Sequence, residues 1–460
     1  MKGISMKQLL VAAAAIAAIV VIPVEAAAFC GLYVAKADTK LFNKASKVVV
    51  ARKGERTVVT MASDYQGDPR EFALVVPVPT VIKRAQINLT TNKLVDHLDA
   101  YTAPRLVEYY DPNPCVDFRV HYSSRSRFRL NASDRVAGAT TARAQALGVT
   151  IEAQYSVGEY EILILSAKQS DGLMTWLNAT GYKVPAKAKA VLASYIKQDM
   201  RFFVAKVNLE KKKALGFNYL RPIQVAFETS KFMLPIRLGT VNANGPQDMI
   251  VLALTEKGRV EATNYRTKRI PSNLDIPIFT RNEFGKFYRA MFDHQVKKDG
   301  MRAVYLEYAW NMAWCDPCAA DPIPNEKLVE LGAYWLLDGR GIERRRQRVW
   351  QGQRPQNVFV TRLHVRYDAK NFPEDIRFQE TGDRSNFQGR YILRHPYTGP
   401  NATCEGVKTY RETVEARRRK QIENLAELTG WPRTEIERRM KQTSPKVNRP
   451  WYEQMWRKRG

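Results

Sequence analysis

The chain has 460 residues, too many for one compact core, so its length predicts two or three domains. Hydrophobic residues make up 45% and charged residues 26%, an ordinary globular composition that excludes disordered, collagen-like and multi-span membrane proteins. Lysine and arginine total 73 against 46 aspartate and glutamate residues, a formal net charge of +27. This positive excess is the one unusual number, and it points either to an anionic partner or to a need for solubility.

The first 28 residues have the features of an export signal. A positively charged start precedes an uncharged apolar run over residues 9–22, and Ala26 and Ala28 fit the −3 and −1 positions of a cleavage site. The run is shorter than the ~20 residues that span a bilayer comfortably. We therefore expect a signal peptide at 1–28 and a periplasmic or secreted protein, with an uncleaved N-terminal membrane anchor as the alternative.

Export changes the meaning of the charge. No later stretch of the sequence is long and apolar enough to cross a membrane. An exported basic protein meets anionic envelope polymers or lipid head groups, whereas a cytoplasmic one would meet nucleic acid. We therefore expect no nucleic-acid partner. The alternative is that the charge only keeps the protein soluble.

The N-terminal region, residues 29–230, is predicted to be α+β. Short runs of β-branched and aromatic residues predict strands at 47–52, 57–61 and 71–76. The third strand should stop pairing at Pro77. A strand–helix–helix–strand unit follows, with strands at 160–166 and 201–207 and helices at 171–177 and 186–196.

The second region, residues 231–405, is predicted to be strand-rich. Strands are expected at 249–254, 303–310 and 358–367, the last with clean period-two alternation. His364 lies in that alternating strand, where a structural role is expected rather than catalysis. The arginine-rich segment 340–354 is predicted to be an exposed excursion.

The tail, residues 406–460, is predicted to be a basic helical hairpin. Apolar residues at helical spacing predict a first helix that Gly430 caps, and a second helix is expected at 434–441. Residues 408–460 hold 15 basic and 7 acidic residues. The hairpin resembles a helix-turn-helix, but the export signal argues against DNA.

One string suggests chemistry, Trp314-Cys315-Asp316-Pro317-Cys318, which resembles the active-site sequence of thioredoxin-like oxidoreductases. In those proteins a helix N-terminus stabilises a thiolate. Here the better helix start is Asn325, and the charge of Asp316 raises thiol pKa values. A structural disulfide is favoured for Cys315 and Cys318, and a redox pair or half of a metal site are the alternatives.

The remaining cysteines are Cys30, Cys115 and Cys404, so five thiols leave at least one unpaired within the chain. Cys30 and Cys115 are further disulfide candidates. A zinc site would need more ligands, for which only Cys404 and His395 suggest themselves, and no metal site is expected. The acidic residues within 374–383 lack the spacing of an EF-hand and predict a polar turn.

Several long strings, spread over nearly the whole mature chain, resemble the bacterial exported family known as domain of unknown function 2330. They are FCGLYVAKADTKLFNKAS from Phe29, DYQGDPREFALVVPVP from Asp64, LVDHLDAYTAPRLVEYYDPNPC from Leu94, AWCDPCAADP from Ala313 and FQETGDRSNFQGRYILRHP from Phe378. The resemblance implies a bacterial source and an envelope location. It carries no catalytic or binding residue, because the activity of the family is unknown.

The sequence therefore predicts an α+β protein with mixed and antiparallel sheets and a basic helical tail. The favoured function is a non-enzymatic binding or structural role in the cell envelope. The alternative is a periplasmic thiol–disulfide oxidoreductase that uses Cys315 and Cys318. No motif predicts a cofactor, and none predicts an oligomeric state.

Overall fold

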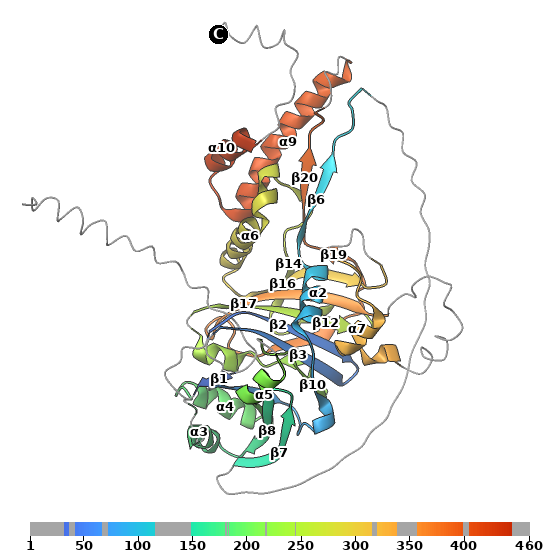
Figure 1. The fold of residues 1–460 in the computed structure, drawn as a ribbon. Helices are drawn as coiled ribbons and strands as arrows, with labels where there is room; N and C mark the ends of the chain where they lie inside the picture. Colours follow the sequence, from blue (N-terminus) through green and yellow to red (C-terminus); the bar gives the residue numbers. More distant parts are fainter. Residues whose placement is uncertain are drawn as a thin grey trace, which may run out of the picture.

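The structure is a computed structural model. It describes residues 32–35, 42–66, 72–115, 149–179, 182, 184–216, 219–243, 245–314, 320–337, 357–398 and 404–443. The predicted signal peptide and the arginine-rich segment 340–354 lie outside these ranges. The fold is α+β, with helices packed on mixed and antiparallel sheets and two helices at the C-terminal end, as the sequence predicts (Figure 1).

A nine-stranded sheet forms the centre of the molecule. Its path is β14-β16-β17-β12-β2-β3-β10-β5, and β19 pairs with β16. The strands are β2 (Phe42–Lys53), β3 (Arg56–Gln66), β5 (Ile87–Leu89), β10 (Ile223–Glu228), β12 (Gln247–Thr255), β14 (Arg266–Arg269), β16 (Ala303–Asn311), β17 (Phe359–Tyr367) and β19 (Phe387–Gln388). The pairs β2–β12 and β14–β16 are parallel and the others antiparallel. The predicted boundary near residue 230 stays a prediction, and this sheet takes strands from both sides of it.

Both faces of the central sheet carry apolar clusters, which explains the continuous apolar runs in its strands. Val48 and Val50 of β2 face one cluster, while Val49 and Ala51 face the other. The first cluster includes residues of a small sheet, ordered β11 (Met233–Leu234), β18 (Ile376–Glu380) and β13 (Val260–Ala262). The second includes residues of α2 (Asn92–Thr102), α7 (Asn325–Glu330) and η5 (Tyr334–Leu337).

A five-stranded sheet lies below the central sheet in Figure 1. Its order is β1 (Leu32–Ala35), β4 (Phe72–Val78), β9 (Arg201–Val207), β8 (Tyr160–Ala167) and β7 (Val149–Val157). The predicted strand–helix–helix–strand unit is confirmed as β8, α3 (Ser170–Ala179), α4 (Ala188–Ile196) and β9. The two helices cover one face, and the other face packs against β3 and β10. The shorter elements nearby are η2 (Arg84–Gln86), α5 (Leu209–Ala214) and η3 (Arg237–Asn242).

The expected end of pairing at Pro77 is wrong. Pro77 pairs with Phe202 of β9, and the ladder continues to Val78. On the other side of β4, pairing with β1 ends at Val75. Among the described residues, Pro77 therefore stands where β4 is hydrogen-bonded on one side only, the position in a sheet at which a missing N–H is tolerated.

The remaining elements form a helical unit, which we define as β6, β15 and β20 with α6, α9 and α10. The parallel sheet is ordered β15 (Leu274–Asp275), β20 (Arg390–His395) and β6 (Arg105–Tyr110). The helices are η4 (Ile278–Glu283), α6 (Phe284–Lys298), α9 (Gly406–Thr429) and α10 (Arg433–Thr443), all packed around one apolar cluster. The predicted cap is confirmed, because Gly430 ends α9 with a φ of 71° and donates its N–H to the carbonyl of Ala426.

Candidate anion-binding surface

The candidate site lies next to the polar face of β17. Arg362, His364 and Arg366 alternate with Leu363 and Val365, so they point to the opposite face of the central sheet from that apolar pair. Helices α2 and α6 lie over this face, and both contribute partners to its charged groups. Arg362 is thus buried, and His364 and Arg366 are partly buried.

Glu307 neutralises the centre of that face. It stands at a β-bulge of β16, where the pairing register with β17 shifts between Leu306 and Tyr308. Its carboxylate is fully buried, accepts a hydrogen bond from Arg362 Nε at 2.5 Å and lies 2.7 Å from His364 Nδ1. The Tyr288 hydroxyl of α6 also donates to it. Burial opposes the charge, but His364, Arg362 and these bonds hold the pKa of Glu307 down to about 2.

The ends of this network are also paired. Arg362 Nη1 reaches Asp99 of α2 at 2.5 Å, and Asp99 in turn holds Lys47 of β2 at 2.7 Å. At the other end Arg366 binds Asp248 with two bonds of 2.7 and 2.6 Å and reaches Asp293 of α6 at 2.5 Å. Bidentate geometry of this kind fixes orientation as well as charge.

The His364 ring also contacts α6. It stacks on Phe292 of α6, with ring centroids 3.7 Å apart and planes 4° apart. The expected structural role of His364 therefore agrees with its surroundings. Together with the bond between Arg366 and Asp293, this contact joins α6 to the central sheet.

The end of α6 and the neighbouring strand β14 present cations with no such partners. We define the β14 patch as Arg266, Lys297, Lys298 and Arg302, all of them exposed. Within the described ranges, none of the four has a carboxylate at ion-pair distance. The one acidic group among them, Asp299, is bound by Lys268 at 2.5 Å and by the Tyr305 hydroxyl at 2.8 Å.

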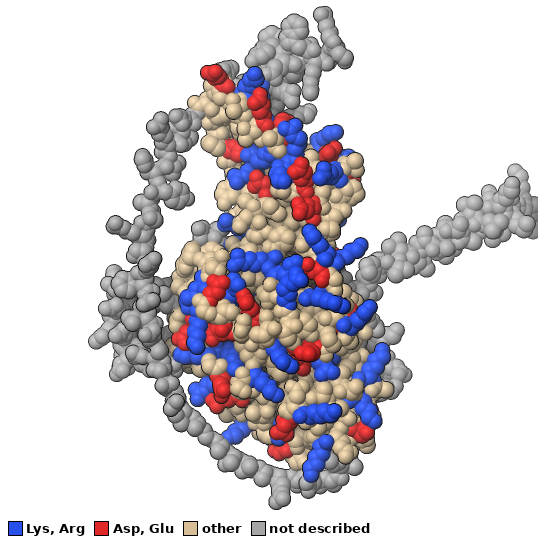
Figure 2. Space-filling model, turned by 180° about the vertical axis from the view of Figure 1, so that it is seen from behind, with Lys and Arg blue, Asp and Glu red and all other residues tan. Residues whose placement is uncertain are grey.

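Two observations place the segments that carry these cations together. Arg266 pairs with Ala303, which follows Arg302 in the chain. The bond between Lys268 and Asp299 joins β14 to the end of α6, which Figure 1 shows reaching the sheet beside β14. At this level, beneath the helical unit, Figure 2 shows blue side chains gathered across one face of the molecule and outnumbering red ones.

The predicted basic tail differs from the β14 patch. Five of the ten cations in α9 and α10 form ion pairs with acidic groups. The pairs are Arg417–Asp111, Arg418–Glu415, Lys420–Glu423, Arg438–Glu435 and Arg439–Glu283. Paired charges add little field at a distance, so the β14 patch is the stronger candidate for attracting an anion.

The predicted cysteine sites are only partly within the described residues. Cys315, Cys318 and Cys30 lie outside them. Cys115 is in a disulfide, and its partner is Cys404, with the two Cα atoms 5.7 Å apart. Cys404, considered above as a zinc ligand beside His395, is therefore taken by a different bond.

His395 and the acidic turn have structural partners as well. His395 Nε2 lies 2.7 Å from Glu108 of β6. The strand β18 occupies residues 376–380 of the predicted turn. Asp375, just before it, accepts a bond of 2.6 Å from the Tyr195 hydroxyl, and Glu380, its last residue, accepts the backbone N–H groups of residues 256 and 257. Across the described ranges, no three His, Cys, Asp or Glu side chains come together as metal ligands would.

Sequence reasoning missed both Glu307 and the β14 patch. A signal for the patch was present in two short strings, Arg266-Thr267-Lys268-Arg269 and Lys297-Lys298-Asp299-Gly300-Met301-Arg302. Only the parallel pairing of β14 with β16 brings them together. Nothing local in the sequence predicts that pairing.

Comparisons with known proteins give a family and no activity. The model of a family described as "Uncharacterized protein conserved in bacteria (DUF2330)" matches residues 24–379. No curated protein and no solved structure matches the chain. In the part of the chain that the structure describes, no helix has both the length and the apolar character needed to cross a bilayer. Because the family match covers well over half of the 460 residues, the chain belongs to DUF2330, a family of bacterial proteins.

Proposed function

We propose that this chain is an exported protein of the bacterial cell envelope that binds anionic polymers or lipid head groups through the β14 patch, without catalysis. The observation that carries the proposal is the gathering of four exposed cations, none with an ion pair in the described residues, at the end of α6 and on β14. Phosphate and carboxylate groups are the anions such cations attract. The predicted signal peptide supports the envelope location.

The first experiment tests location. Fractionation of the native bacterium, with N-terminal sequencing of the recovered protein, should give an envelope protein that begins at Phe29. An intact Met1 in the membrane fraction would support the anchor instead. Recovery from the cytoplasm would contradict the proposed location.

The second experiment tests the patch with two variants of equal net charge. The first carries Arg266→Glu, Lys297→Glu, Lys298→Glu and Arg302→Glu. The matched control carries Lys93→Glu, Lys187→Glu, Arg419→Glu and Arg433→Glu, which are exposed cations elsewhere without an ion pair in the described residues. Binding to phosphatidylglycerol vesicles and to soluble polyphosphate is measured for both.

The patch variant should lose on the order of a thousandfold in affinity, because each of its four cations is worth about 1 kcal/mol near an anionic surface. The control variant should lose much less. Binding should also weaken steeply with salt, since the Debye length falls to about 3 Å at 1 M. Equal losses in the two variants would mean that only total charge matters, and absence of binding would leave solubility as the role of the charge.

A further inference from the structure

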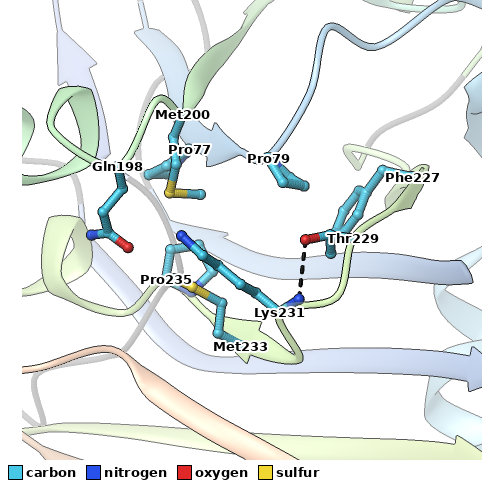
Figure 3. Close-up of a pocket in the computed structure, with 9 residues that line it drawn as sticks. All are labelled: Pro77, Pro79, Gln198, Met200, Phe227, Thr229, Lys231, Met233 and Pro235. Atoms are coloured by element: carbon cyan, nitrogen blue, oxygen red, sulfur yellow. Dashed lines mark hydrogen bonds between the residues drawn. The ribbon is translucent and has the colours of Figure 1, made fainter. Parts of the chain in front are cut away.

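A groove beside the five-stranded sheet has the shape and lining of a small-ligand site (Figure 3). A pocket of about 120 Å³ shares Gln198, Lys231 and Met233 with an adjoining hollow of about 380 Å³. The smaller pocket has mostly apolar walls, formed by Pro77, Pro79, Met200, Phe227, Met233 and Pro235. Together the two spaces fall in the size range of small-molecule sites.

The walls come from segments that the fold fixes in place. Pro77 and Pro79 stand at the end of β4, and Met200 immediately precedes β9. The turn before Met200 contains Asp199 in the left-handed region, with a φ of 57°, and Arg201 binds its carboxylate at 2.7 Å. Non-glycine residues keep this conformation only where the surroundings hold it, so this wall is preorganised. The two methionines give the groove an adaptable apolar surface.

Lys231 lies between the two spaces. Its backbone N–H donates to Thr229 Oγ1 at 3.2 Å, and Figure 3 shows its side chain extending across the pocket toward Gln198. No carboxylate of the described residues pairs with its ammonium group. The loop is also held by Arg52, whose guanidinium donates to the carbonyl of Thr229 at 2.9 Å and stacks over Phe232.

The charged side chains that line the two spaces, Lys231 and Arg377, are both positive. Neither space is lined by an acidic side chain. Arg377 lines the larger hollow, and its one ion pair among the described residues is an exposed contact of 3.5 Å with Glu374. Exposed contacts of this kind are worth little, so Arg377 is available to a ligand anion. An apolar pocket beside a cation fits a molecule with an apolar body and one acidic group.

We infer that this groove binds a small amphipathic monoanion, with its apolar body against Met200 and Met233 and its acidic head group against Lys231. Charge complementarity favours this occupant over a neutral or cationic one of the same shape. The inference does not depend on the β14 patch, because none of the patch residues lines the groove.

The experiment measures binding of decanoate to the mature protein by calorimetry. Decanol lacks the charge, decyltrimethylammonium carries the opposite charge, and acetate lacks the apolar body. We expect saturable binding of decanoate and at least about tenfold weaker binding of each of the other three. Equal binding of decanol and decanoate, or no saturable binding at all, would overturn the inference.

Variants assign the binding to Lys231. Lys231→Met should weaken decanoate at least about tenfold while leaving decanol unchanged, and Gln198→Glu should weaken decanoate by adding a negative charge. Lys257→Met is the control, since Lys257 is exposed and lines neither space. Melting curves show that each variant is folded. If Lys231→Met bound decanoate with unchanged affinity, Lys231 would not belong to the site and the inference would be wrong.

Discussion

The central sheet and the helical unit are stabilised in different ways. The sheet carries apolar clusters on both faces, and the charged groups on the polar face of β17 form a network around Glu307. The helical unit has one apolar cluster and is tied down by polar links near the surface. Those links include the disulfide between Cys115 and Cys404 and the contacts of Asp111 with Arg417 and Tyr410.

Helix α6 belongs to both regions. Its first half, with Phe287 and Met291, packs in the cluster of the helical unit. Its second half, with Phe292 and Val296, packs beside β16 and the charge network. This difference predicts that removal of a contact in the network should lower the stability of the whole protein. Removal of a surface link should lower the stability of the helical unit first.

The largest effect is expected from Glu307→Ala. It leaves Arg362 and His364 without their buried counter-charge, which typically costs about 3–5 kcal/mol. Urea unfolding followed by circular dichroism measures the loss. Glu427→Ala, an exposed change on α9, is the control and should stay within about 0.5 kcal/mol. Equal effects of the two changes would mean that the network does not support the central sheet.

Acid should act on the same network. The folded pKa of Glu307 is about 2, against a usual value near 4.5, because His364 and Arg362 outweigh the effect of burial. A lowered folded pKa contributes stability that is complete above about pH 4.5 and is lost as the pH falls toward 2, worth about 3 kcal/mol in all.

Unfolding free energies measured between pH 6 and 2 test this dependence. Glu307→Gln should reduce the loss of unfolding free energy below about pH 4.5. Other paired carboxylates with lowered pKa values, such as Asp99 and Asp111, should still cause part of that loss. A loss unchanged by Glu307→Gln would contradict the assignment.

Removal of the disulfide should affect the helical unit. Cys115→Ser with Cys404→Ser opens a loop of 289 residues, and we expect a loss of about 2–4 kcal/mol. Limited proteolysis should then cut α9 faster than the strands of the central sheet. Reductant added to the unmodified protein should reproduce the effect. Equal acceleration of cleavage in both regions would break the distinction between them.

The smallest effect is expected from Asp111→Asn. The carboxylate accepts bonds from Arg417 at 3.0 Å and from the Tyr410 hydroxyl at 2.7 Å, and the amide replaces a charged acceptor by a neutral one. A loss of about 1–2 kcal/mol should appear as a lower melting temperature. Glu412→Gln, an exposed change on α9, the helix of Tyr410 and Arg417, should leave the melting temperature unchanged.

Local structure was predictable where a short pattern determines it. The alternation of residues 358–367 predicts β17, and Gly430 with the apolar spacing before it predicts α9 and its end. Alternation cannot tell a solvated polar face from a buried one, however. The burial of Arg362 and His364 depends on α2 and α6, which the pattern of β17 does not contain.

The candidate sites depend on pairings between distant segments. The partner of Cys115 follows from the position of β6 beside β20, which no spacing in the sequence encodes. The groove likewise needs the end of β4 beside the loop after β10. The number of cysteines and the hydrophobic periodicity do not determine which distant segments pair.

The pairing of β6 with β20 constrains the order in which the chain can fold. Arg105 of β6 pairs with Arg390, and in the described ranges β6 has no other strand beside it. Because the chain is synthesised from its N-terminus, β6 therefore has no strand to pair with until residues 390–395 have been made. A product truncated before residue 390 keeps the family-matched strands of the central sheet but exposes β6 as an unpaired edge. Such fragments should aggregate, so completion of the last strands acts as a check on synthesis of the whole chain.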